Sequence, residues 1–169
     1  MKTYLVITVL GNDRPGLVSS LANLVAEHGG SWLESRMARL AGQFAGIARL
    51  ECPPENADLL IRELQGPSTS GLTVIAVREE AAEPTPLRTL IVDVVGNDRP
   101  GILRELTAAV ASAGGNIEEL TTGLESAPMS GHPMFRAHGV ISVPENTETA
   151  AITVAIESLG GDLTVDLSI

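Results

Sequence analysis

The chain has 169 residues, with 11 Lys+Arg against 21 Asp+Glu and a formal net charge of −10. Its 44% hydrophobic and 19% charged residues are typical of a globular protein and exclude a disordered or membrane-embedded chain. The negative charge repels nucleic-acid phosphates and anionic membrane surfaces, so we expect neither as a direct partner. Its one cysteine, Cys52, excludes an intrachain disulfide and fits a cytoplasmic protein.

Apolar spacing predicts six elements in the first half of the chain. The N-terminal apolar run is predicted to be a strand and not a signal peptide, because a Gly-rich turn follows after about eight residues. Pro15 is expected in the first turn of the helix after it, and Gly29 with Gly30 at that helix's end. In chain order we expect a strand at 3–10, a helix through Leu17, Leu21, Leu24 and Val25, strands at 32–40 and 43–51, a helix through Ala57, Leu60, Ile61 and Leu64, and a strand at 72–77.

The second half repeats the first. The sequence Gly-Asn-Asp-Arg-Pro-Gly at 11–16 recurs at 96–101, and the identities continue at the pairs Leu21/Leu106, Val25/Val110, Gly29/Gly114, Gly30/Gly115 and Glu34/Glu119. The offset grows between Gly30/Gly115 and Phe44/Phe135, which places extra residues in a longer loop at 125–133. The second copy therefore predicts a strand at 87–95, a helix through Ile102, Leu106, Ala109, Val110 and Ala113, strands at 116–124 and 134–143, a helix through Ile152, Ala155, Ile156 and Leu159, and a strand at 163–167.

The element order β-α-β-β-α-β, found twice, is that of ferredoxin-like folds. We therefore expect an α+β protein with two antiparallel sheets, divided into residues 1–79 and 88–169 by a linker at 80–87 rich in Glu, Ala and Pro.

These features together resemble ACT domains, the ligand-sensing regulatory modules of many enzymes of amino-acid metabolism. The resemblance is carried by the apolar first strand, the Asp-Arg-Pro-Gly start of the first helix, and the Gly-Gly-[Ser/Asn]-[Trp/Ile] entry into the second strand. Residues 4–16 are also similar to the start of glycine cleavage system transcriptional repressors, which are free-standing tandem ACT proteins. The resemblance implies an amino-acid site at the interface between two ACT units.

Carried over onto this sequence, the ligand contacts would be Asp13 with Ser31 and Asp98 with Asn116. A polar residue of some family members is replaced by glycine at Gly11 and Gly96, which leaves the identity of the ligand open. The residues themselves give independent support, because glycines let a ligand approach the backbone and a helix N-terminus suits a carboxylate. The candidate ligand-binding residues are thus Gly11, Asn12, Asp13, Gly16, Ser31, Gly96, Asn97, Asp98, Gly101 and Asn116.

Simpler interpretations stay open beside this one. The Asn-Asp-Arg-Pro-Gly segment could be only a strand-to-helix turn whose Asp caps the helix. Arg14 and Arg99 could clamp a carboxylate, although a surface ion pair is the commoner role of such arginines. His132 and His138 lack a third ligand in register, so no metal site is expected.

The sequence contains no nucleophile elbow, phosphate-binding loop or metalloprotease motif, so we expect no enzymatic activity and no cofactor. ACT modules of formyltetrahydrofolate deformylases are followed by a catalytic domain, for which these 169 residues leave no room. We expect a cytoplasmic sensor of a small amino acid, glycine or serine, that acts on a protein partner such as a transcription factor and that could form a homodimer. A regulatory subunit docked on a metabolic enzyme, or a purely structural interaction module, are the alternatives.

Overall fold

The computed structural model describes residues 1–69, 71–80, 87–127 and 131–168. The chain divides into two compact units, Met1–Ala82 (unit 1) and Glu83–Ile169 (unit 2), each with its own core. The boundary falls within the predicted linker, most of which lies outside the described residues.

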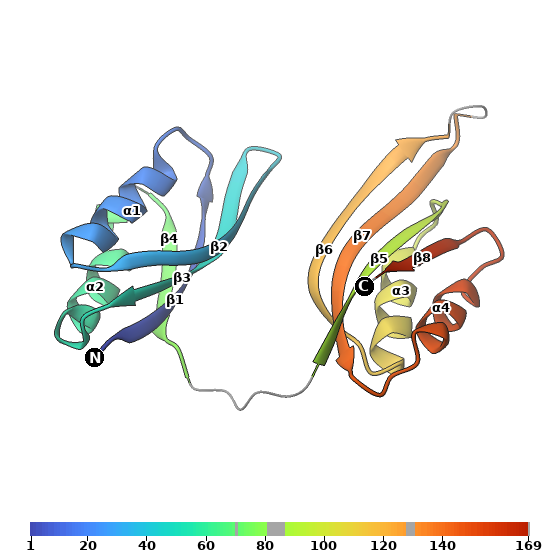
Figure 1. The fold of residues 1–169 in the computed structure, drawn as a ribbon. Helices are drawn as coiled ribbons and strands as arrows, with labels where there is room; N and C mark the ends of the chain where they lie inside the picture. The colour runs from blue at the N-terminus through green and yellow to red at the C-terminus, as the bar shows by residue number, and fades with distance from the viewer. Residues whose placement is uncertain (70, 81–86, 128–130, 169) are drawn as a thin grey trace. The chain divides into compact units, whose positions relative to one another are not determined.

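Unit 1 is a four-stranded antiparallel sheet with two helices on one face (Figure 1). The strands stand in the order β2-β3-β1-β4, so that the first and third strands are central. In chain order the elements are β1 (Thr3–Asn12), α1 (Leu17–Glu27), β2 (Ser31–Leu40), β3 (Gln43–Cys52), α2 (Ala57–Leu64) and β4 (Thr73–Arg78), with short 3-10 turns at Pro54–Asn56 and Pro67–Thr69.

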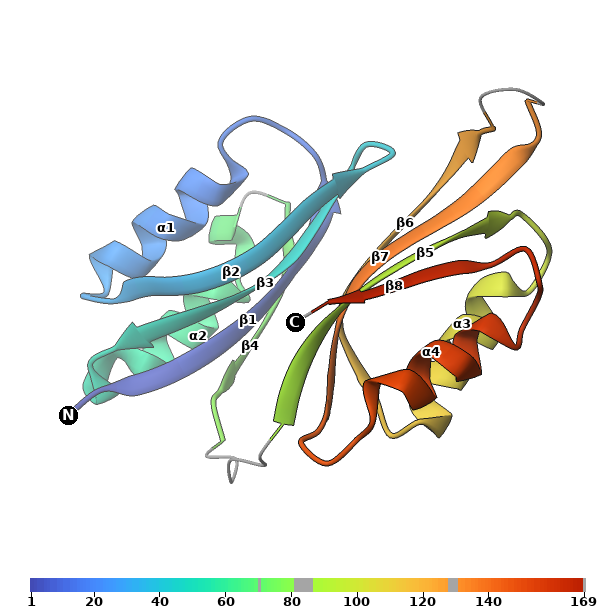
Figure 2. The ribbon, with the colours of Figure 1, turned by 45° about the vertical axis from the view of Figure 1, so that its right-hand side comes forward.

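Unit 2 repeats this architecture, and Figure 2 shows α3 and α4 side by side on one face of its sheet. The strand order β6-β7-β5-β8 is the same as in unit 1. Its elements are β5 (Leu87–Asn97), α3 (Ile102–Ser112), β6 (Asn116–Ser126), β7 (Pro133–Pro144), α4 (Thr149–Glu157) and β8 (Thr164–Ser168). Both units therefore confirm the predicted ferredoxin-like topology of an α+β protein.

Each core lies between the sheet and its helices because alternate strand residues point to opposite faces. Leu5, Ile7 and Val9 of β1 point inward and are at most 1% exposed, while their neighbours along the strand face outward. The apolar stripe of α1, which ends at Leu24 and Val25, covers this inner face. In unit 2 the inner face is formed in the same way by Leu90, Val92 and Val94 under α3 and α4.

The structure corrects two details of the sequence prediction. Pro15 and Pro100 lie in a turn ahead of each helix and not in its first turn, because Gly16 and Gly101 occupy the N-cap positions in the left-handed conformation. Helix α4 ends at Glu157 and α3 at Ser112, so Leu159 and Ala113 pack against the core from beyond their helices. The longer loop predicted at 125–133 lies partly outside the described residues.

The double glycines behave as predicted. Gly29 has a φ of 68°, its N–H donates to Ala26 O, and the N–H of Gly30 donates to Val25 O. This pair of bonds closes the C-terminus of α1, as left-handed glycines commonly do.

Among the described residues no helix is long and apolar enough to cross a membrane.

Gly16 offers a direct test of the turn. Its φ of 89° is strained for any residue with a side chain, although a Cβ there would meet no other atom within 4 Å. We expect Gly16→Ala to lower the free energy of unfolding by about 1–2 kcal/mol, measured by urea denaturation. Gly123→Ala is the matched control, because a Cβ at Gly123 also meets nothing and the backbone there has no positive φ. Equal stability of the two variants would contradict this explanation.

Candidate functional site

The first part of the predicted site is the turn between β1 and α1. The Asp13 carboxylate pairs with Arg39 Nε at 2.6 Å, and the Asp13 N–H donates to Gly42 O at 2.9 Å. Asn12 Oδ1 accepts a hydrogen bond from Gln43 Nε2. Asp13 is thus tied to the β2–β3 hairpin and is not the cap of α1, which has no side-chain cap hydrogen bond.

The corresponding turn of unit 2 is held by different contacts. The N–H of Asp98 donates to Pro133 O, and the N–H of Asn97 donates to Asp162 Oδ2. Arg99 pairs with Glu105 Oε2 at 2.6 Å and donates to Leu159 O, an arrangement that raises the pKa of Arg99 and lowers that of Glu105. Arg99 therefore fixes the turn to α3 and to the segment after α4, in agreement with the ion-pair interpretation.

The glycines of the two turns have two separate structural roles. Gly11 faces Leu72, where a Cβ would lie 2.8 Å from Leu72 Cδ2, and Gly96 faces Leu163 in the same way. These two glycines therefore allow a leucine to pack over the strand end. Gly16 and Gly101 instead adopt the left-handed conformation that starts each helix, and neither α1 nor α3 has a side-chain cap. The first N–H groups of α1 are thus available to an anionic ligand. In α3 the Ile102 N–H already donates to Arg99 O, which leaves the N–H groups after it.

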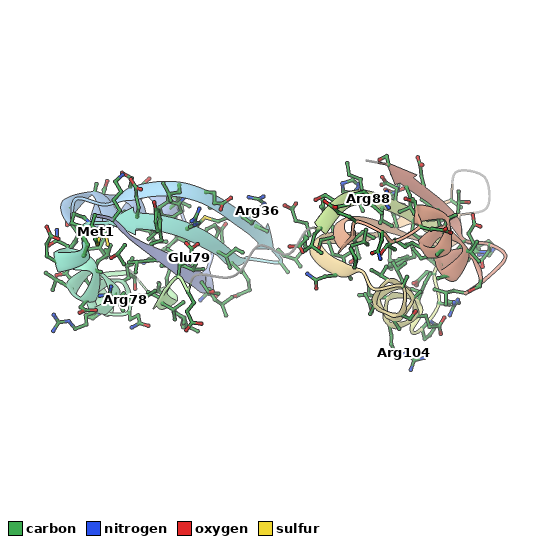
Figure 3. All side chains as sticks on the ribbon, turned by 60° about the horizontal axis from the view of Figure 1, so that its bottom comes forward. Met1, Arg36, Arg78, Glu79, Arg88 and Arg104 are labelled. Carbon is green, nitrogen blue, oxygen red and sulfur yellow. The ribbon has the colours of Figure 1, made fainter. Side chains whose placement is uncertain are left out.

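The second part of the site in unit 1 is the start of β2. Ser31 pairs with Glu51 of β3 and lines a hollow of about 200 Å³ together with Met1, Lys2, Gly29, Glu51, Cys52 and Pro53. Lys2 Nζ forms an ion pair with Glu51 Oε1 in this hollow. Figure 3 shows Met1 at this end of unit 1. Burial raises the pKa of the Cys52 thiol, which keeps it protonated at neutral pH.

In unit 2 the start of β6 is filled by a hydrogen-bond network. Asn116 Nδ2 donates to Glu118 Oε1 at 2.9 Å, and Ser142 Oγ donates to the same oxygen at 2.5 Å. The bond from Ser142, followed by that from Asn116, lowers the pKa of Glu118. Glu118 lies where a β-bulge shifts the register between Ile117 and Glu119. The Asn116 amide, a candidate ligand donor, is therefore already engaged within its own unit.

The structure places the turn and the strand start at opposite ends of each sheet. Asn12 pairs with Gln43 and Ser31 pairs with Glu51, eight positions apart along β3, which corresponds to about 27 Å. Asn97 and Asn116 are related in the same way through Met134 and Ser142 of β7. Asp13 and Ser31 of one unit cannot contact the same small molecule, and the same holds for Asp98 and Asn116.

Sequence reasoning missed Lys2, Glu51 and Glu118. Lys2 and Glu51 become neighbours only through the pairing of β1 with β3, and Glu118 reaches Asn116 and Ser142 only because of the bulge. The alignment of the two copies contains one signal that could have indicated Glu51. The charged Glu51 of the first copy aligns with the neutral Ser142 of the second.

The histidines do not gather into a metal site. His28 contacts Leu24 O through Nδ1 at the C-terminus of α1, and His138 pairs with Asp93 at 2.9 Å. Within the described ranges there is no group of three metal-ligating side chains.

Two separate four-stranded antiparallel sheets, each covered by two helices, define a protein built from two small α+β modules. The model of the ACT domain family matches residues 3–75 and 88–124, and the chain belongs to this family. The resemblance read from the sequence is thereby confirmed.

Several known proteins are similar to this chain over almost its whole length. Over 98% of its length the chain is 29% identical to the glycine cleavage system transcriptional repressors of Escherichia coli (strain K12) and Shigella flexneri, and it covers 88% of each. A crystal structure of an unknown protein from Galdieria sulphuraria superposes with a TM-score of 0.87 at 27% identity, covering 99% of this chain and 98% of that one. A candidate glycine cleavage system transcriptional repressor of known structure shares the fold, with a TM-score of 0.70 at 20% identity over 99% of this chain and 97% of its own.

The network around Glu118 predicts an acid-sensitive contribution to stability. Because the pKa of Glu118 is lowered in the folded state, its contribution is present above the unfolded value near 4.5 and is lost as the pH falls through the folded value. We expect Glu118→Gln to lower the free energy of unfolding at pH 7 by up to about 1 kcal/mol, since the group is solvent-screened. The difference from the wild-type protein should shrink between about pH 5 and pH 3, as measured by urea denaturation at each pH.

Ser142→Ala is the matching variant, because it removes the main donor to the same carboxylate. It should reduce the same pH dependence. A difference between Glu118→Gln and wild type that stays constant from pH 7 to pH 3 would show that the network does not act in this way.

Proposed function

We propose that this chain is a non-enzymatic, cytoplasmic regulator that binds a small amino acid, glycine or serine, and passes that state to a protein partner in the control of glycine cleavage genes. The observation that carries the proposal is the ACT family match in both units, joined to the similarity over 98% of the chain to repressors of that name. The contacts and charges of the candidate residues support the proposal.

The turns of both units supply one half of an amino-acid site. The uncapped N-termini of α1 and α3 suit a carboxylate, because their N–H groups and the helix dipole present positive charge. The carboxylates of Asp13 and Asp98 suit an ammonium group. Asp13 is 29% exposed beside its partner Arg39, so it would contact a ligand without leaving that ion pair.

The strand starts supply the other half, and the distance of about 27 Å within one sheet decides how the halves combine. A turn and a strand start that contact the same small molecule must come from two different ACT units. The edge strands β2 and β6 are exposed along most of their length, and such edges pair readily with another strand. We propose that pairing of this kind in a homodimer completes the site.

Charge supports action through a protein partner. Unit 2 has four Lys+Arg against twelve Asp+Glu and unit 1 has seven against nine, so most of the net charge of −10 lies on unit 2. Neither unit offers the excess of cations with which proteins bind DNA. A transcriptional role therefore requires a second protein that contacts the DNA.

Titration calorimetry against the twenty amino acids tests ligand binding. We expect glycine or serine to bind, and at least one turn variant and one strand-start variant among Asp13→Ala, Asp98→Ala, Ser31→Ala and Asn116→Ala to weaken binding about tenfold or more, as for loss of a hydrogen bond to a charged group. Circular dichroism would show that each variant is folded. The proposal fails if no amino acid binds, or if all four variants bind as the wild-type protein does.

A gel-shift experiment tests the indirect route to DNA. The purified chain alone should not shift a DNA fragment at physiological salt, with or without glycine, because its charge opposes that of the phosphates. Capture of a transcription factor from cell extract, sensitive to glycine, is expected. Tight and sequence-specific DNA binding by the chain alone would refute the partner-mediated mechanism, whereas capture of a metabolic enzyme would favour the regulatory-subunit alternative.

A further inference from the structure

The hollow at the start of β2 has the size and the lining of a small-ligand site. Its volume of about 200 Å³ corresponds to about seven water molecules at roughly 30 Å³ each, and a small amino acid has a similar number of non-hydrogen atoms. Ser31 lies in its wall, so it coincides with the strand-start half of the proposed site. Its charged side chains are Lys2 and Glu51, one of each sign.

Glu51 is the group in this hollow with unused bonding capacity. Its side chain is only 13% exposed, and Oε1 accepts from Lys2. In the part of the chain that the structure describes, Oε2 of Glu51 has no hydrogen-bond partner. Because this oxygen is reached by solvent, it is free to accept a charge-assisted hydrogen bond from a cationic donor.

Lys2 is the more exposed member of the ion pair. Its side chain is 60% exposed, so its attraction to Glu51 is screened by water and is easily exchanged for another partner. An amino-acid zwitterion entering the hollow replaces one ion pair with two. Its ammonium group meets Glu51 and its carboxylate meets Lys2. The ammonium group has three N–H donors, so it can also donate to Asp13 or Asp98 of the turn contributed by a second ACT unit.

We propose that Lys2 and Glu51 are the residues that select an amino-acid zwitterion, with Glu51 binding the α-ammonium group and Lys2 the α-carboxylate, and that the strand start of unit 1 is the one that takes the ligand. This inference rests on the amino-acid binding proposed above and assigns it to one end of one unit. The uncapped helix start of a second ACT unit adds positive charge beside the same carboxylate, so the two half-sites are compatible.

Unit 2 lacks both of these charges at the equivalent positions. Leu87 stands in place of Lys2 and Ser142 in place of Glu51. The carboxylate of Glu118, which comes from the bulge, accepts from Asn116 and Ser142, and no cation is paired with it among the described residues. The start of β6 is therefore a self-satisfied network and supplies a matched control within the same chain.

Calorimetry with three related probes tests the assignment. Glycine carries both charges, glycinamide lacks the carboxylate, and N-acetylglycine lacks the ammonium group. We expect the full-length wild-type protein to bind glycine at least about tenfold more tightly than either analogue, and Glu51→Gln to weaken glycine about tenfold. Lys2→Met should weaken glycine severalfold, whereas Glu118→Gln should leave the affinity unchanged.

The analogues separate a direct contact from a structural effect. If Glu51 binds the ammonium group, Glu51→Gln should not weaken N-acetylglycine, and Lys2→Met should not weaken glycinamide. A variant that fails to fold is replaced by the charge-exchanged double variant Lys2→Glu with Glu51→Lys, which keeps an ion pair but reverses its direction. That protein should be folded and should still bind glycine more weakly than the wild type does.

Cys52 gives a second measurement at the same place. It lines the hollow and is the one cysteine of the chain, so a thiol reagent can modify no other thiol. Because Cys52 is only 3% exposed, its alkylation requires an opening of the structure beside the hollow, which a bound ligand would oppose. Saturating glycine should slow the alkylation of the wild-type protein several-fold and should have no such effect on Glu51→Gln. A chain that binds amino acids while Lys2→Met and Glu51→Gln keep the wild-type affinity would overturn this inference alone. A wild-type chain that binds none of the twenty amino acids would overturn the proposed function and this inference together.

Discussion

The pairing of β1 with β3, repeated as β5 with β7, is the constraint on which the rest of each unit depends. These central strands pair over ten and eleven positions, so they fix the register of the whole sheet. They also fix which strand residues face the helices, because a shift of one position would exchange the buried and exposed faces. Every candidate functional residue lies at one end or the other of this ladder, and its possible neighbours follow from the register.

The register has a direct consequence for ligand binding. The chain leaves the sheet at the end of the first strand, runs back along a helix, and begins the next strand at the opposite end of the sheet. The Asp-Arg-Pro-Gly turn and the Ser31 or Asn116 position are therefore kept apart by the length of the sheet. Under the proposed function, an ACT unit taken singly would offer two half-sites of different chemistry, and a complete site would need two units.

Duplication has preserved the fold of the two units but not the chemistry of their strand starts. Both units keep the bulge after the first residues of the edge strand, between Trp32 and Glu34 and between Ile117 and Glu119. In unit 1 a hollow lies beside Lys2 and Glu51, whereas in unit 2 the bulge carries Glu118, which bonds to Asn116 and Ser142. The concentration of negative charge on unit 2 is a second difference. Equivalent backbones thus present unequal surfaces, which allows one unit to bind a ligand and the other to serve a different role.

The sequence alone determined the domain class, the element order and the duplicated turn. Alternating and helical apolar spacings depend only on local geometry, and the repeated Asn-Asp-Arg-Pro-Gly motif is visible without a structure. The chain contacts of Asp13, Arg99 and Asn116 depend on partners distant in sequence, namely Arg39, Glu105 with Leu159, and Glu118 with Ser142. The packing of Gly11 and Gly96 against leucines also depends on residues distant in sequence, so it could not be predicted from the sequence either. Only the tertiary structure decided that the two halves of the predicted site lie at opposite ends of a sheet, because strand pairing converts separation along the chain into distance in space. It alone also brought Lys2 to Glu51 and left a hollow beside Ser31.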